Sequence, residues 1–179
     1  MCLIASELST EEGLSTATYE AIMYWKLYSQ PAAVTNICER IHTDTTVGAL
    51  ITEGLRSLRY IFPATLSRNL SDVQELYRKL QEHAAPLHGM KTPCSLAVRT
   101  TFLHFAYPEV IPLFDKQVLL AVGVCERKAN QKLHYLFEYM QHAWTLSADP
   151  SLVPTNWQES PLRLLDMALW VNRGMGNEA

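Results

Sequence analysis

Apolar residues recur three and four positions apart along most of this chain, the spacing that places them on one face of an α-helix. The clearest set follows Asp44 and consists of Val47, Leu50, Ile51, Leu55, Leu58 and Phe62. No segment shows the strict alternation of a half-buried β-strand. We therefore expect an all-α fold of about eight helices, over residues 11–29, 31–41, 44–61, 71–85, 93–105, 116–122, 127–146 and 162–172.

Helix starts are marked by side chains that can satisfy the free backbone amides of a first turn. The strings Ser9–Glu12 and Ser71–Gln74 both have the form of a capping box. Asp44 and Asp115 each stand where an N-cap is expected, and Gly48 either weakens its helix or allows another helix to come close. Short connections favour an irregular or orthogonal bundle over four long antiparallel rods.

The length and composition fit one globular domain. A chain of 179 residues that is 48% hydrophobic can bury a core of its own. We expect a single helical domain over residues 1–179, with 173–179 as a flexible tail. The net charge is −3, yet residues 56–132 hold eleven basic and six acidic side chains between two acidic flanks. This basic middle third fits either ordinary solvated helix faces or a nucleic-acid-binding surface.

Targeting, redox and cofactor motifs are not found. The four cysteines form no C-x-x-C pair, which favours buried thiols in a reducing, cytoplasmic compartment. There is no signal-peptide pattern, and no apolar run reaches the ~18 residues of a membrane span. Phosphate-binding glycine motifs and the nucleophile elbow do not occur, so we expect no cofactor.

A ladder of metal-binding residue types lies in the long helix predicted over 127–146. His134, Glu138 and His142 are four residues apart and share one helix face. Because no second helix supplies a matching Glu-x-x-His, a solvated helix face fits these residues as well. No metal is therefore assigned, and a metal-dependent enzyme is kept as a third alternative.

The strongest candidate for chemistry lies between residues 87 and 116. It begins with Leu87–Pro93 (Leu-His-Gly-Met-Lys-Thr-Pro), a tight turn before a helix. It continues with Thr100–Pro108 (Thr-Thr-Phe-Leu-His-Phe-Ala-Tyr-Pro) and ends with Pro112–Asp115 (Pro-Leu-Phe-Asp). Backbone amides at a helix start favour an anion, and a carboxylate at the next helix start is kept ionised by the helix dipole.

This segment resembles the helix-hairpin-helix DNA glycosylase superfamily, in which a Leu-x-Gly-x-Gly hairpin binds a DNA phosphate and a Pro-x-Asp loop supplies a carboxylate that assists loss of a damaged base. It is also similar to small helical proteins with the string Ser-Lys-x-Leu-His-Phe-x-x-Pro followed by Pro-x-x-Asp. The string Pro161–Trp170 has the look of that group as well. Lys91 replaces the second hairpin glycine, and Thr101 stands where the string has lysine. The resemblance therefore implies a monofunctional enzyme without a Schiff-base lysine.

The resemblance implies a glycosylase-like fold that binds DNA and acts on a flipped nucleotide. Asp115 is then the catalytic carboxylate, which stabilises a cationic sugar transition state. The residues expected to contact nucleic acid are Gly89, Lys91, Thr92, Arg99 and Lys116. His104 and Tyr107 are expected to line the pocket.

Non-catalytic interpretations remain open. Asp is among the best N-cap residues, so Asp115 needs no catalytic reason to stand before a helix. His104 also fits a semi-buried histidine with its hydrogen bonds satisfied. The acidic total charge and the departures at Lys91 and Thr101 fit a scaffold domain that binds another protein.

Overall fold

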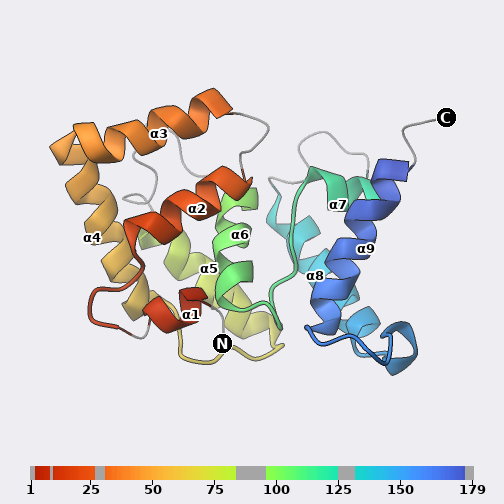
Figure 1. Ribbon diagram of the computed structural model, residues 1–179. Coiled ribbons are helices and arrows are strands. Elements are labelled where there is room, and N and C mark those ends of the chain that lie inside the picture. Colours follow the sequence, from red (N-terminus) through yellow and green to blue (C-terminus); the bar gives the residue numbers. More distant parts are fainter. Residues whose placement is uncertain (1–2, 9, 27–30, 84–95, 125–131, 176–179) are drawn as a thin grey trace. The chain divides into compact units, whose positions relative to one another are not determined.

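The computed structural model describes residues 3–8, 10–26, 31–83, 96–124 and 132–175, and this part of the chain is all-helical, as the sequence predicts (Figure 1). Its elements are α1 (Leu3–Leu8), α2 (Thr16–Lys26), α3 (Pro31–Thr43), α4 (Thr45–Ile61), α5 (Leu70–His83), α6 (Leu96–Ala106), α7 (Lys116–Ala121), α8 (Leu133–Ser147), the 3-10 turn η3 (Pro150–Leu152) and α9 (Pro161–Met175). The chain divides into two compact units, Met1–Cys94 with α1 to α5 and Ser95–Ala179 with α6 to α9. A single domain over residues 1–179 stays a prediction.

Helix α4 is the centre of the first unit, because α1, α2, α3 and α5 all pack against it. Its buried side includes Val47, Ile51, Leu55 and Leu58 of the predicted stripe, together with Ile61. Leu50, predicted as part of the same stripe, is instead 54% exposed. Gly48 lies where the end of α3 comes close: a Cβ at this position would be 2.6 Å from the carbonyl oxygen of Ile41. The glycine therefore serves close packing between α3 and α4.

Helix α2 begins at Thr16, about five residues later than the spacing predicts. Gly13 has a φ of +70°, which breaks the helical path just before this point. The hydroxyl of Ser15 accepts a hydrogen bond from the amide of Thr18 at 3.2 Å. The carboxylate of Glu7 then accepts from the amide of Ser15 at 2.9 Å and from the hydroxyl of Thr18 at 2.6 Å. A cap that reaches back to α1 therefore replaces the capping box predicted upstream.

Other helix boundaries differ by only a few residues. Helix α5 begins at Leu70, and the side chain of Asn69 accepts from the amide of Ser71 at 2.9 Å. Helix α9 runs to Met175 and so extends into the segment predicted as a tail. Helix α8 begins at Leu133, six residues later than predicted, because the backbone of Lys132 is extended (φ −109°, ψ 121°). The hairpin residues Gly89, Lys91 and Thr92 lie outside the described residues.

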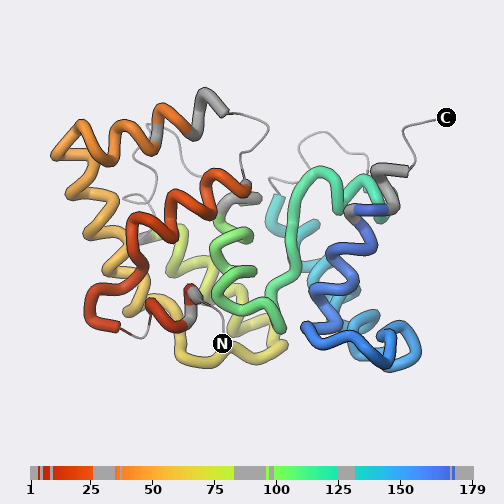
Figure 2. The backbone as a smooth tube through the Cα atoms, in the orientation of Figure 1, coloured from red at the N-terminus to blue at the C-terminus, as the bar shows by residue number. Residues whose placement is uncertain are grey.

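In the second unit, α9 packs against both α7 and α8. The chain between α6 and α7 forms a long connection over residues 107–115, drawn in green in Figure 2 and called the connecting loop below. Residues 110–114 of this loop are buried, with Ile111 at 0%, Phe114 at 1% and Leu113 at 2% exposure. A buried segment without secondary structure must find partners for its backbone groups elsewhere in the protein.

Large apolar side chains also reach the surface of both units. On α2 the buried stripe runs through Tyr19, Ile22 and Met23, whereas Tyr24 and Trp25 are 51% and 40% exposed. Across the ranges that the structure describes, no helix combines the length and apolar character needed to cross a membrane.

Candidate functional site

The connecting loop is held by side chains from α6, α8 and the start of α9. Nδ1 of His104 on α6 donates to the carbonyl oxygen of Ile111 at 2.7 Å. Nε1 of Trp144 on α8 donates to the carbonyl oxygen of Val110 at 2.6 Å. The hydroxyl of Ser160, just before α9, donates to the carbonyl oxygen of Pro108 at 3.4 Å. These side chains supply the partners that helix or sheet would otherwise give to buried carbonyl groups.

A buried carboxylate, that of Asp166 on α9, connects this loop to two helices. Its Oδ2 accepts a hydrogen bond from the amide of Leu113 at 3.1 Å, and its Oδ1 accepts from the hydroxyl of Tyr139 at 3.3 Å. Nδ1 of His104 is 3.8 Å from Oδ2, longer than a hydrogen bond. Asp166 is 0% exposed and His104 is 3% exposed, so the cluster is part of the interior.

Burial raises the pKa of Asp166 to about 7, from an ordinary value of 3.8, and the negative charge of Asp115 acts in the same direction. Hydrogen bonds from Leu113 and Tyr139, together with the positive charge of Arg163, oppose this rise without cancelling it. Burial also raises the pKa of Tyr139, and the charge of Asp166 adds to that effect. A carboxyl with a pKa near 7 occurs both in catalytic sites and in buried structural clusters.

Asp115 ends the connecting loop and begins α7. Its Oδ1 accepts hydrogen bonds from the amides of Gln117 at 2.8 Å and Val118 at 3.0 Å, so it is the N-cap that the sequence predicts. Its side chain is half-exposed. The pKa of Asp166 is raised in part by the charge of Asp115, which places the two carboxylates within electrostatic reach of each other. Asp115 is therefore at once a helix cap and a partly accessible carboxylate.

The other predicted site residues have varied surroundings. Lys116 is exposed at the first position of α7, directly after Asp115. Arg99 is half-buried on α6, and no described residue accepts a hydrogen bond from its buried Nε. His104 and Tyr107 are buried, and burial raises the pKa of Tyr107. The predicted roles of these residues in DNA binding and in a base pocket stay predictions, as do those of the hairpin residues outside the described part.

Three residues of this cluster had no predicted role: Tyr139, Trp144 and Asp166. A signal for Asp166 was present in the sequence, since it is an acidic residue inside the apolar string Leu162–Leu169. No comparable signal marks Trp144 or Tyr139, because an aromatic residue with helical spacing is most often part of the core. The indole N–H of Trp144 and the hydroxyl of Tyr139 gain a role in holding the site only because the connecting loop and Asp166 lie beside them in the folded chain.

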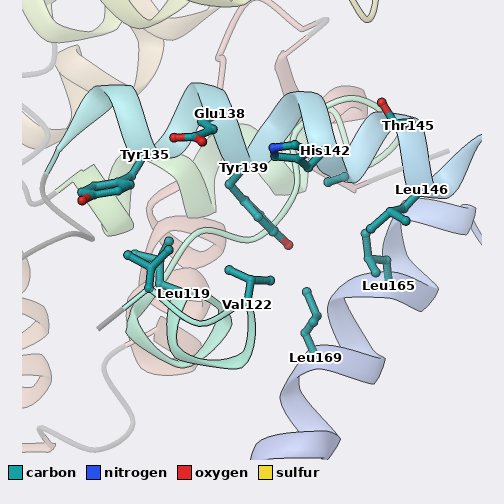
Figure 3. Close-up of a pocket in the computed structure, with 12 residues that line it drawn as sticks. Leu119, Val122, Tyr135, Glu138, Tyr139, His142, Thr145, Leu146, Leu165 and Leu169 are labelled. Atoms are coloured by element: carbon teal, nitrogen blue, oxygen red, sulfur yellow. The ribbon is translucent and has the colours of Figure 1, made fainter. Parts of the chain in front are cut away.

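A separate hollow of about 470 Å³ lies among α7, α8 and α9 (Figure 3). We call it the apolar hollow, because its walls are mostly aliphatic: Leu119, Val122, Leu146, Leu165 and Leu169 are among the residues that line it. The polar residues that line it, Glu138, His142 and Thr145, all come from α8. Its volume is within the range of small-molecule sites.

The metal hypothesis finds no support in the part of the chain that the structure describes. Within it, no group of three or more His, Cys, Asp or Glu side chains is arranged to hold a metal ion. Glu138 and His142 line the apolar hollow, whereas His134 does not. Its ring instead lies against the ring of Tyr135, with the centroids 4.2 Å apart.

Comparisons with known proteins assign no family: no family model, no curated protein and no solved structure matches this chain.

Proposed function

We propose that this protein binds nucleic acid and is related to the helix-hairpin-helix base-excision DNA glycosylases, with Asp115 as the catalytic carboxylate. One observation carries the proposal. The half-exposed carboxylate of Asp115 stands at the end of a loop that side chains hold at Pro108, Val110, Ile111 and Leu113. A catalytic group is effective when its supporting shell fixes its position in this way.

The chemistry follows from the position of the carboxylate. The amides of Gln117 and Val118 donate to the carboxylate of Asp115, and both hydrogen bonds fix its position at the start of α7. When a damaged base leaves with its bonding electrons, positive charge develops on the sugar, and a nearby carboxylate stabilises it. Water then completes the reaction on the flipped nucleotide. Lys116, exposed beside Asp115, is placed to contact a neighbouring phosphate.

DNA binding is tested first, because it does not require the right damaged base. We expect the affinity for a short DNA duplex to fall steeply with salt, measured by fluorescence anisotropy between 50 and 200 mM, roughly the range over which phosphate contacts are lost. Lys116→Ala should weaken binding and reduce the salt slope by about 1. Arg40→Ala, on α3 and outside the basic middle third, is the control, since its side chain is 43% exposed. Binding that is equally weak at all salt concentrations contradicts the proposal.

Catalysis is tested with two matched cap variants. Asp44 caps α4 with the same hydrogen-bond pattern as Asp115 at α7, since its Oδ1 accepts from the amides of the second and third residues that follow. Asn is about as good an N-cap as Asp, so both Asp→Asn variants should fold. We expect Asp115→Asn to abolish base release from duplexes that carry a deaminated, oxidised or alkylated base, and Asp44→Asn to leave it unchanged. Equal activity in the two variants rules out the catalytic role.

The alternative is a non-catalytic domain that binds another protein. It is favoured by Tyr24 and Trp25, adjacent aromatic residues on α2 that are 51% and 40% exposed. Aromatic residues of this kind are enriched at protein interfaces. This alternative predicts a stable oligomer by size-exclusion chromatography with light scattering, which Tyr24→Ser together with Trp25→Ser should convert to a monomer.

A further inference from the structure

The apolar hollow in the second unit has the size and walls of a small-molecule site. Its volume is about 470 Å³, and it lies where α7, α8 and α9 converge (Figure 3). Leu119 and Val122 line it from α7 and its C-terminal end, and Leu165 and Leu169 line it from α9. Figure 3 shows these side chains turned toward one another around open space.

The rim of the hollow leaves apolar surface in contact with water. Val122 is 45% exposed and Leu146 is 48% exposed, although both line the same concave surface. A ligand that covered them would remove this surface from water, which is the main driving force for binding apolar molecules. Scattered apolar side chains on a surface need no explanation, but two at the edge of one cavity favour a ligand that fills it.

The polar side of the hollow is a single stripe of α8. Glu138, His142 and Thr145 follow helical spacing and therefore share one face of that helix. The hydroxyl of Thr145 donates to the carbonyl oxygen of Gln141 at 2.9 Å, so it is committed to its own helix. Among the described residues that line the hollow, Glu138 is the one carboxylate, and none is a lysine or an arginine.

The floor of the hollow is held by the buried cluster next to it. Tyr139 lines the hollow with its ring, and its hydroxyl donates to the carboxylate of Asp166 at 3.3 Å. Leu165 and Asp166 both belong to α9, so the hydrogen bond from Tyr139 to Asp166 joins two of the helices that line the hollow. A wall held in this way does not collapse easily into the space, and a preformed cavity binds a ligand at lower entropic cost.

We propose that the apolar hollow binds a small molecule with a compact apolar body and one cationic amine head. The body lies against the leucines of α7 and α9, and the amine lies at the α8 side near the Glu138 carboxylate. This ligand site is independent of the glycosylase proposal, because none of its residues is assigned to DNA binding or to base release.

Three probes with the same apolar body and different heads test the proposal: 1-adamantylammonium, 1-adamantanol and 1-adamantanecarboxylate. Binding to the full chain is followed by isothermal titration and by NMR shifts of the leucine and valine methyl groups. We expect the ammonium to bind most tightly and the carboxylate most weakly, with shifts at Leu119, Val122, Leu165 and Leu169. Glu138→Gln should weaken the ammonium about threefold, the size expected for an exposed ion pair, and leave the alcohol unchanged.

Filled-cavity variants show whether binding is at the hollow. Leu169→Trp should weaken all three probes at least about tenfold. Thr145→Trp, at an exposed position on the rim, is a second filling variant in case Leu169→Trp does not fold. Val171→Trp, 60% exposed on α9 and not among the lining residues, is the matched control.

Four results would count against this ligand site. Failure of all three probes to bind, or binding that Thr145→Trp and a folded Leu169→Trp leave intact, overturns the proposal. Tighter binding of the carboxylate than of the ammonium overturns the assignment of the head group. A dimer that Thr145→Trp dissociates means that a second copy of the chain, and not a small molecule, covers the hollow.

Discussion

The carboxylate of Asp166 accepts a hydrogen bond at 3.1 Å from the backbone amide of Leu113, which lies 53 positions earlier in the chain. Leu113 belongs to the loop that ends at Asp115, and Asp166 belongs to the last helix. Two sequence strings that carry the glycosylase resemblance, the loop and Pro161–Trp170, therefore meet at one buried cluster. This hydrogen bond holds the two strings together in the folded protein, and this structural role does not depend on catalysis.

Loss of the Asp166 carboxylate should be strongly destabilising. Asp166→Ala leaves the amide of Leu113 and the hydroxyl of Tyr139 without their acceptor, and two buried unsatisfied donors cost roughly 2–5 kcal/mol. Asp149→Ala removes an exposed carboxylate that caps η3 and should cost much less stability. The free energies of unfolding in urea compare the two variants. A loss for Asp166→Ala no larger than that for Asp149→Ala contradicts the buried cluster.

The same carboxyl should make stability depend on pH. Its pKa is raised from 3.8 to about 7 on folding, so between these values the folded state holds a proton that the unfolded state has released. The stability that this proton contributes is therefore fully present below about pH 4 and is lost as the pH rises to about 7. Between these two pH values the free energy of unfolding should fall by about 1.4 kcal/mol per pH unit.

The substitution Asp166→Asn replaces the carboxyl with a neutral amide, which does not titrate between pH 4 and pH 7. We expect the free energy of unfolding of the natural chain, minus that of Asp166→Asn, to fall between pH 4 and pH 7 and to level off above it. The other titratable and charged groups near this site, His104, Asp115 and Arg163, are common to both proteins. A difference that is constant over this range means that Asp166 does not titrate there.

Removal of the Trp144 indole N–H should loosen the connecting loop. Trp144→Phe keeps most of the packing and loses the 2.6 Å bond to Val110, which should cost about 1 kcal/mol. Trp157→Phe is a matched control, since it loses a 3.1 Å indole bond to the carbonyl of Ser160 outside the loop. We expect hydrogen exchange at the amides of Ile111 and Leu113 to quicken in Trp144→Phe and to stay unchanged in Trp157→Phe. If the exchange rates of these amides are the same in both variants, the hydrogen bond of Trp144 does not stabilise the connecting loop.

Two glycines with positive φ should respond differently to alanine. A Cβ on Gly13, at φ +70°, would lie 2.9 Å from the Cα of Arg56, whereas a Cβ on Gly123, at φ +84°, meets nothing within 4 Å. Gly123→Ala should cost only the left-handed backbone strain, about 1–2 kcal/mol, and Gly13→Ala should cost more, because the backbone of α4 must also move. Thermal unfolding followed by circular dichroism compares them, and an equal loss of stability argues against close contact at Gly13.

The helical class, most helix positions and the caps at Asp44 and Asp115 could all be predicted from the amino-acid sequence. These features depend on residues within about four positions of each other, so spacing and cap chemistry reveal them directly. Two helix starts were predicted wrongly. Helix α2 begins late because Glu7, on α1, caps it together with Ser15, and helix α8 begins at Leu133 because the backbone of Lys132 is extended.

The roles of His104, Trp144 and Asp166 became visible only in the folded chain. Each has a partner in the connecting loop, and the partner of Asp166 is 53 residues away, which no local pattern can specify. The apolar hollow is likewise formed by residues of three helices, and its leucines have the same spacing as any core leucine. Periodicity shows which residues are on one face of a helix, but the packing of helices against each other determines whether that face meets protein, water or a ligand.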